Sequence, residues 1–213
     1  MKAQGNRFLR MGIFMLALFV VWTVLIQIVD VRSAGKTGTE VGFAALNGWF
    51  HQLTGVHMLL YTMTDWLGLI PVFVCLLFGG LGFVQMIRRK CLLRVDRDIL
   101  LLGVYYLLVI FVYLFFEMYP VNYRPILIEG RLEASYPSST TLLVLSVMPT
   151  LSVQAYRRLQ NVKLKKIISR MTLLFSLFMV VGRLASGVHW LTDIVGSVLL
   201  SCGLFCMYQA TVI

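Results

Sequence analysis

The sequence of 213 residues is 59% hydrophobic and only 13% charged, and its mean hydropathy is +0.85. A soluble domain has about 25% charged residues, so the composition excludes an ordinary soluble domain and favours an integral membrane protein. The formal net charge of +10 does not indicate a nucleic-acid partner, because the basic residues form short clusters between apolar runs, as they do in membrane proteins.

Six apolar runs approach the length of about 20 residues that a membrane span needs. The fourth run is the most polar and contains Pro149, which a packed membrane helix tolerates with a kink. We therefore predict an all-α, polytopic membrane protein that forms a single domain over residues 1–213. The predicted spans are Met11–Val29, Asp65–Ile87, Ile99–Phe116, Ser138–Ala155, Ile167–Leu184 and Trp190–Val212.

The basic residues lie mostly on one side of the predicted membrane. Of the 19 Lys and Arg residues, 14 precede the first span or fall in the loops at residues 88–98 and 157–170. By the positive-inside rule, we expect these loops and both termini in the cytoplasm of a bacterial cell, and the alternate loops outside. The basic residues on the outer side are Arg32, Lys36, Arg124, Arg131 and Arg183.

A short hydroxyl-rich segment marks the predicted start of the fourth span. Pro137 leads into Ser138, Ser139 and Thr140. Hydroxyl groups at a helix N-terminus satisfy free backbone N–H groups, and such an N-terminus also binds phosphate well. Capping accounts for only one of these hydroxyls, so the segment is a weak indication of a phosphate site by itself.

The stretch RLASGVHWLTD, from Arg183 to Asp193, places three ionisable residues between two apolar runs. If a helix begins near residues 186–188, His189 lies in its first turn and Asp193 follows on the same face. Asp193 can then accept a hydrogen bond from one imidazole nitrogen and leave the other free for nucleophilic attack. Arg183 can bind a phosphate through two parallel hydrogen bonds. With Arg124, these residues predict an anion or phosphoryl site on the outer side.

The chain resembles the type 2 phosphatidic acid phosphatase (PAP2) superfamily, whose membrane lipid phosphatases share a helical core with vanadium haloperoxidases. The first family motif is Lys, six residues, Arg-Pro; it is matched by Arg124 and Pro125, with Glu117 at the lysine position. The second is Pro-Ser-Gly-His, where this chain has Pro-Ser-Ser-Thr and Thr140 stands at the histidine position. The resemblance covers essentially the whole chain, because the six-span layout and the order of the motifs also agree.

The third family motif is Ser-Arg, five residues, His, three residues, Asp. Arg183, His189 and Asp193 match it in full spacing, with Gly182 in place of the serine. The resemblance implies a phosphatase that needs no metal or other cofactor, in which His189 forms a phosphohistidine and Asp193 orients it. The phosphate-binding residues that it implies are Arg124, Ser138, Ser139, Thr140 and Arg183, with Glu117 and Gly182 as auxiliary positions.

Two departures from the family pattern affect the expected chemistry. Thr140 cannot protonate a leaving group near neutral pH, and general acid catalysis is worth about 10²–10⁴-fold. A leaving phosphate, with a pKa near 6, needs little protonation, so the site favours diphosphates such as undecaprenyl diphosphate, the cell-wall lipid carrier. Alternatively another group supplies the proton; the other histidines, His51 and His57, are more typical of interfacial packing. Glu117 removes one positive charge from the phosphate site but could instead pair with Arg124, so it is not expected to disable the site.

Three functions remain open. The first is an outward-facing phosphatase of a membrane lipid phosphate or diphosphate. The second, favoured by Thr140, is a weak or inactive relative that binds or transports phosphorylated lipids. The third is a structural membrane protein, which the spacing from Arg183 to Asp193 argues against. The expected partners are a phosphorylated lipid and the bilayer, with no nucleic acid. The oligomeric state is undetermined, although FGGLGF at Phe78–Phe83 would allow helices to approach closely.

Overall fold

The computed structural model describes residues 2–34 and 38–213, so Lys36 lies outside the described residues. Eight α-helices make up most of the described chain and confirm the predicted all-α fold. A pair of short antiparallel strands, β1 (Arg32–Ala34) and β2 (Thr39–Val41), was not predicted. The helices are α1 (Lys2–Ile28), α2 (Ala44–Thr54), α3 (Met58–Leu67), α4 (Leu69–Arg89), α5 (Arg97–Met118), α6 (Ser139–Arg158), α7 (Val162–Ala185) and α8 (Leu191–Val212).

Five segments of the described chain are long and apolar enough to cross a membrane, and each contains most of a predicted span. Four of them begin earlier than predicted, at Ala3, Met58, Arg97 and Val162, because helical hydrogen bonding continues through flanking polar residues and because α3 and α4 meet at Gly68. The remaining predicted span, the fourth (Ser138–Ala155), forms helix α6 but is too polar to belong to this set. The count of six spans and the single domain therefore remain predictions. The five segments are Ala3–Ile28, Met58–Arg89, Arg97–Met118, Val162–Ala185 and Leu191–Val212.

Helix α6 is polar because it occupies the middle of the bundle, where it packs against α4, α5, α7 and α8. Its buried residues include Ser146, Thr150 and Gln154. The hydroxyl of Tyr105 donates to the Ser146 carbonyl at 3.0 Å, and the Tyr106 hydroxyl shares a hydrogen bond of 2.7 Å with Thr150. Hydroxyl and amide groups commonly hold membrane helices together in this way, so the low hydropathy of α6 reflects its contacts with other helices.

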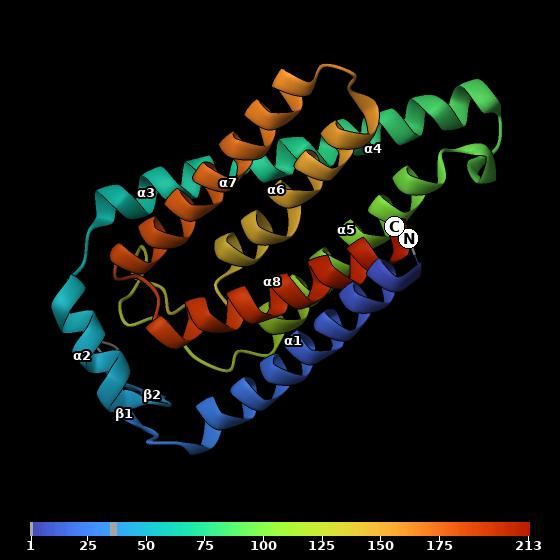
Figure 1. Cartoon of the computed structure of the whole chain (residues 1–213). Coiled ribbons are helices and arrows are strands. Elements are labelled where there is room, and N and C mark those ends of the chain that lie inside the picture. Colours follow the sequence, from blue (N-terminus) through green and yellow to red (C-terminus); the bar gives the residue numbers. More distant parts are fainter. Residues whose placement is uncertain (1, 35–37) are drawn as a thin grey trace.

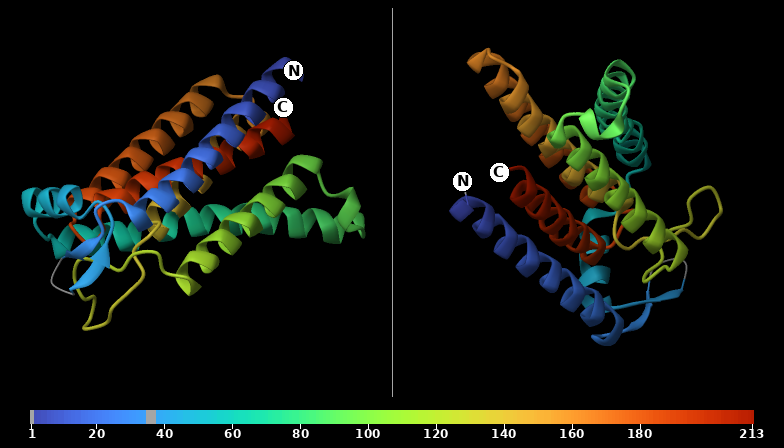
Figure 2. Two further views of the ribbon diagram at one scale, coloured as in Figure 1. Left: turned by 90° about the horizontal axis from the view of Figure 1, so that it is seen from below. Right: turned by 90° about the vertical axis from the view of Figure 1, so that its right-hand side faces the viewer.

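Helices α1 and α8 run antiparallel and side by side along most of their lengths, with both chain termini at the same end (Figures 1 and 2). Three glycines lie in this interface: Gly5 and Gly12 of α1 face Ala210 and Met207, and Gly203 of α8 faces Leu16. Small residues let membrane helices approach closely, which explains how α1 contacts α8 so extensively.

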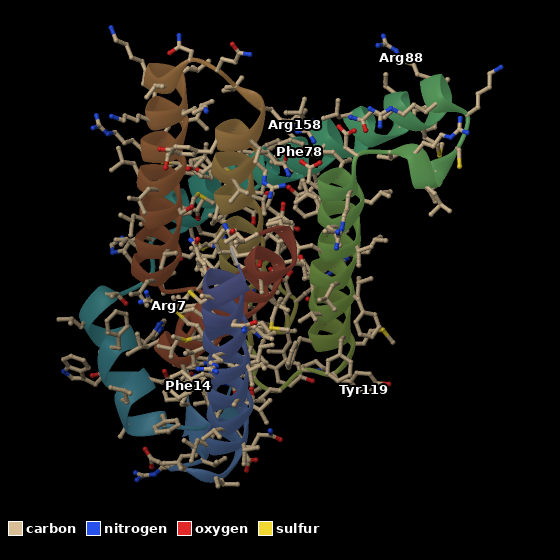
Figure 3. All side chains as sticks on the ribbon, turned by 45° about the vertical axis from the view of Figure 1, so that its right-hand side comes forward. Arg7, Phe14, Phe78, Arg88, Tyr119 and Arg158 are labelled. Atoms are coloured by element: carbon tan, nitrogen blue, oxygen red, sulfur yellow. The ribbon has the colours of Figure 1, made fainter. Side chains whose placement is uncertain are left out.

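The bundle has two chemically different ends. We call the end with both termini, the α4–α5 connection and the α6–α7 connection the basic end (Figure 1). The opposite end, which carries the two strands, α2, the α5–α6 connection and the α7–α8 connection, is the site end. Figure 3 shows Arg88 and Arg158 toward the basic end, whereas Tyr119 lies toward the site end. Fourteen of the 19 basic residues fall in the segments of the basic end, as the sequence predicts.

Candidate active site

His189 lies in the connection between α7 and α8, not in the first turn of a helix. The prediction of a helix start near residues 186–188 is wrong, because α8 begins at Leu191. Gly187 has a φ of +69°, and a Cβ at this position would collide with the carbonyl of Gly55. The turn therefore needs glycine. The turn places His189 in the protein interior, where only 3% of the residue is exposed.

Ser135 connects His189 to Asp193. The Nδ1 atom of His189 is 3.1 Å from the Ser135 carbonyl oxygen and 3.2 Å from its hydroxyl oxygen, whereas Asp193 Oδ2 is 3.8 Å away. The Ser135 hydroxyl in turn donates a short hydrogen bond to Asp193 Oδ2. His189 and Asp193 are therefore close, but the predicted hydrogen bond between them is wrong: the hydrogen-bond contacts of Nδ1 among the described residues are to Ser135, which the sequence did not indicate.

Asp193 is fully buried and fixed by neighbouring donors. Its carboxylate accepts from the Trp190 backbone N–H at 2.8 Å and from the Asn122 side chain at 3.3 Å, in addition to Ser135. The first of these bonds satisfies a free N–H group at the start of α8. Asp193 therefore joins the start of α8 to the α5–α6 connection and helps to hold the segment that carries His189.

The other imidazole nitrogen of His189 is available for chemistry. Within the described part of the chain, Nε2 is buried and has no hydrogen-bond partner. Donation from Nδ1 to the Ser135 carbonyl assigns the tautomer in which Nε2 carries a lone pair. Burial, reinforced by the positive charges of Arg124 and Arg183, holds the pKa of His189 well below its ordinary value. The imidazole is therefore neutral near pH 7, as a nitrogen nucleophile must be.

Arg183 is the more buried of the two arginines near His189, with 1% of its side chain exposed. Its Nη2 donates to the Thr140 hydroxyl at 2.6 Å and lies 3.3 Å from Asp65 Oδ1. Its guanidinium also lies over the Tyr61 ring, 4.8 Å from the centroid. Its Nε is buried without a hydrogen-bond partner among the described residues. Arg183 thus retains donor capacity for an anion.

Arg124 approaches the same aromatic ring from the α5–α6 connection. Its guanidinium carbon is 5.7 Å from the centroid of Tyr61, so Tyr61 lies against both arginines. The ion pair that the structure shows for Arg124 is with Glu133, at 3.2 Å, whereas the sequence suggested Glu117. Glu117 is exposed near the end of α5. Two buried guanidinium groups thus converge near one neutral histidine.

The hydroxyl-rich segment is at the start of α6, as predicted, but its three hydroxyls differ in direction. Ser138 is fully buried and donates to Thr141 at 3.1 Å. Ser139 and Thr140 are half-buried and line a cavity, and Thr140 also contacts Arg183. Thr140 and Ser139 are therefore the two hydroxyl residues of the segment that adjoin open space.

Gly182 is explained by its neighbour on α3. A Cβ at residue 182 would lie 2.8 Å from the Thr64 methyl group. The Thr64 hydroxyl is instead 3.4 Å from Arg183 Nη1. Thr64 therefore occupies the space that a serine at residue 182 would need and places its own hydroxyl beside the arginine.

An apolar cavity of about 450 Å³ begins beside Thr140 and extends between α4, α5 and α6. Its polar residues are at one end, where Asp65, Ser139 and Thr140 meet. The rest of its lining is mostly apolar and consists of Gly68, Leu69, Val72, Cys75, Val109, Ile110, Tyr113, Leu142 and Leu143. A cavity with this distribution suits a molecule with a polar head and a hydrocarbon tail.

The other two histidines lie before the residues of the site in the chain: His51 is in α2, and His57 directly precedes α3. The His51 ring packs near that of Trp190, with centroids 5.6 Å apart, and His57 Nε2 is 2.9 Å from the Thr54 carbonyl. Neither lines the apolar cavity beside Thr140.

Comparisons with known proteins place these features in a family. The model of the PAP2 superfamily matches residues 98–212, which include Arg124, Thr140, Arg183 and His189. The fold is similar to the crystal structure of the first transmembrane PAP2-type phosphatidylglycerolphosphate phosphatase from Bacillus subtilis, with a TM-score of 0.64 over 94% of each chain. The two sequences are 16% identical, so this likeness concerns the fold alone. No curated protein matches the chain.

Proposed function

The chain belongs to the PAP2 superfamily, and on this premise we propose that it is a metal-independent lipid phosphatase whose nucleophile is His189. The observation that carries the proposal is the buried Nε2 of His189, which has no hydrogen-bond partner among the described residues and lies near two buried arginines. A neutral nucleophile in a positively charged setting suits attack on the phosphorus of an anionic substrate.

Arg183 and Arg124 hold the phosphate in this proposal. Both guanidinium groups contact Tyr61, and Arg183 still has an Nε–H group to donate. Backbone N–H groups at the start of α6 add further donors beside Thr140. Charge-assisted hydrogen bonds of this kind are stronger than neutral ones and stabilise the charge that the transferring phosphoryl group carries.

The substrate that we propose is a membrane lipid with a terminal phosphate. Its hydrocarbon tail enters the apolar cavity between α4, α5 and α6, and its phosphate reaches past Thr140 toward His189. Thr140 is no general acid, so a diphosphate is preferred over a monophosphate, since a phosphate leaves without the proton that an alkoxide needs. Polyprenyl diphosphates such as undecaprenyl diphosphate combine a long apolar tail with this leaving group.

We place the site end outside a bacterial cell membrane and both termini in the cytoplasm. The support is the concentration of basic residues in the segments of the basic end. A Glu129→Cys variant, with the four native cysteines replaced by alanine, tests this orientation, because residue 129 is exposed in the α5–α6 connection. Impermeant maleimide should label it on intact cells. Labelling only after the membrane is opened would reverse the orientation.

A second candidate function is binding or transport of phosphorylated lipids without hydrolysis. The contact between Thr140 and Arg183 favours it, because the residue at the place of a proton donor instead accepts a hydrogen bond from the anion-binding arginine. Purified protein incubated with undecaprenyl diphosphate, phosphatidic acid and phosphatidylglycerophosphate separates the two functions. We expect phosphate release, fastest from the diphosphate. Binding of these lipids without release of phosphate from any of them would establish the second function.

A further inference from the structure

Asp65 brings a carboxylate to the mouth of the apolar cavity. Its Oδ1 is 3.3 Å from Arg183 Nη2, the same nitrogen that donates to the Thr140 hydroxyl at 2.6 Å. The Asp65 side chain is 56% exposed, whereas that of Arg183 is 1% exposed. Asp65 therefore forms an ion pair with an arginine of the site and still faces open space.

The cavity determines on which side of the phosphorus Asp65 lies. In the proposed function the lipid tail occupies the cavity, so the oxygen that leaves with the tail lies at the cavity mouth. Attacking and leaving atoms lie roughly in line on opposite sides of the phosphorus. Nε2 of His189 attacks from one side, and the leaving oxygen is then on the side of Asp65 and Thr140.

Hydrolysis of a phosphohistidine needs a water molecule on this same side. The water takes the place of the departed lipid, because it too must attack opposite the bond to Nε2. Water is a weak nucleophile near neutral pH and reacts faster when a positioned base accepts its proton. The Thr140 hydroxyl is a poor base, and Asp65 is the one carboxylate among the described residues that line the cavity.

We propose that Asp65 is the general base for the second half of the reaction, an inference that rests on the proposed function. The Asp65 carboxylate accepts a proton from water while the water oxygen forms a bond to phosphorus. The bond between phosphorus and Nε2 breaks, and its electron pair returns to His189. Inorganic phosphate leaves, and Asp65, whose side chain is 56% exposed, then gives up the proton. The first half of the reaction needs no acid when the leaving group is itself a phosphate.

The Asp65→Asn variant tests this role, because the amide oxygen still accepts a hydrogen bond from Arg183 but cannot act as a base. Wild type and variant are mixed rapidly with polyprenyl diphosphate radiolabelled at its terminal phosphate and quenched in alkali, in which phosphohistidine is stable. In Asp65→Asn we expect label to enter the protein at nearly the wild-type rate and then to accumulate. Steady-state phosphate release should fall by about 10²–10⁴-fold.

Glu133→Gln is the matched control, because Glu133 pairs with the other arginine of the site but does not line the cavity. This variant should accumulate no phosphoprotein. Asp65→Glu should restore part of the phosphate release. Hydroxylamine, which attacks without a base, should discharge the labelled Asp65→Asn protein faster than water does.

Two results would overturn the role of Asp65 while leaving the phosphatase intact. One is an Asp65→Asn variant with unchanged phosphate release. The other is a parallel loss of labelling and release, which would make Asp65 only a partner that positions Arg183. A wild-type protein that neither releases phosphate nor becomes labelled would instead remove the proposed function itself, and the role of Asp65 with it.

Discussion

The two ends of the bundle use arginines and carboxylates in opposite ways. At the basic end, Arg158 contacts Asp96 at 3.4 Å and Asp98 at 2.7 Å, and Arg89 contacts Asp96 at 2.9 Å. These side chains are 17–43% exposed. The hydrogen bond from Arg89 holds the pKa of Asp96 below its usual range. At the site end, the side chain of Arg183 is 1% exposed and that of Arg124 is 8% exposed.

This difference separates charges that support the fold from charges that serve a site. Partly exposed ion pairs contribute only about 0–1 kcal/mol each, and their arginines are well solvated without further partners. A buried guanidinium is costly unless it is fully hydrogen-bonded, and ionisable groups within membrane segments commonly mark functional sites. Arg183 has a buried Nε that lacks a partner among the described residues, so its burial is best explained by an anionic ligand.

The largest expected difference between the two ends is in how turnover responds to an added histidine. Thr140→His would place a general acid beside the leaving oxygen and should raise turnover of lipid monophosphates by up to about 10²–10⁴-fold. Turnover of lipid diphosphates should rise much less. Gln160→His, in the exposed α6–α7 connection of the basic end, should change neither rate. Wild-type protein that already hydrolyses phosphatidic acid as fast as a diphosphate would contradict the preference that we assign to Thr140.

Removing one arginine from each end should lower kcat/KM by very different factors. Arg183→Gln removes a charged donor from the phosphate and should lower kcat/KM by about 10²–10³-fold, the usual cost of losing one transition-state donor. Arg158→Gln should leave kcat/KM within about twofold and lower the free energy of unfolding by about 0.2–1 kcal/mol for each ion pair lost. Steady-state kinetics and thermal unfolding measure the two effects. Equal losses of activity in the two variants would contradict the claim that Arg183 serves the site whereas Arg158 supports the fold.

The smallest expected effect is a shift in the pH dependence of kcat/KM. The attacking group is neutral His189, whose pKa burial and the two nearby arginines hold well below its ordinary value. As the pH is lowered, kcat/KM should therefore persist through about pH 6.5 and fall only in more acidic solution. Arg124→Gln removes a positive charge, raises the pKa of His189 and should move this fall to higher pH. The substrate ionises identically in both assays, so coincident profiles would refute the electrostatic effect of Arg124.

The sequence predicted the parts of the site that have a fixed spacing. Arg183, His189 and Asp193 lie within one short segment, so the end of α7 and the start of α8 inevitably bring them together. It also placed Thr140 at the start of α6. It did not indicate Ser135, because a single serine in a polar connection has no distinguishing pattern.

The sequence also did not predict that α3 contributes residues to the site, and here the reason is different. Tyr61, Thr64 and Asp65 reach the site only through packing of α3 against α7, a contact between residues more than 100 positions apart in the chain. One available signal was Asp65 itself, an acidic residue at the start of a predicted span. The same limitation hid α2, and it made α6 look like the weakest span, since its polar face is satisfied by neighbours that hydropathy does not register.

The most direct test of the proposed nucleophile is to identify the atom that becomes phosphorylated. Wild-type protein is mixed with radiolabelled polyprenyl diphosphate, quenched within milliseconds, digested and analysed by mass spectrometry. The proposed phosphohistidine mechanism predicts phosphate on Nε2 of His189, formed before free phosphate appears. It also predicts that His189→Ala loses the label together with about 10⁴-fold or more of the phosphate release, as expected for a nucleophile. A label on another residue, or near-normal phosphate release by His189→Ala, would contradict the phosphohistidine mechanism.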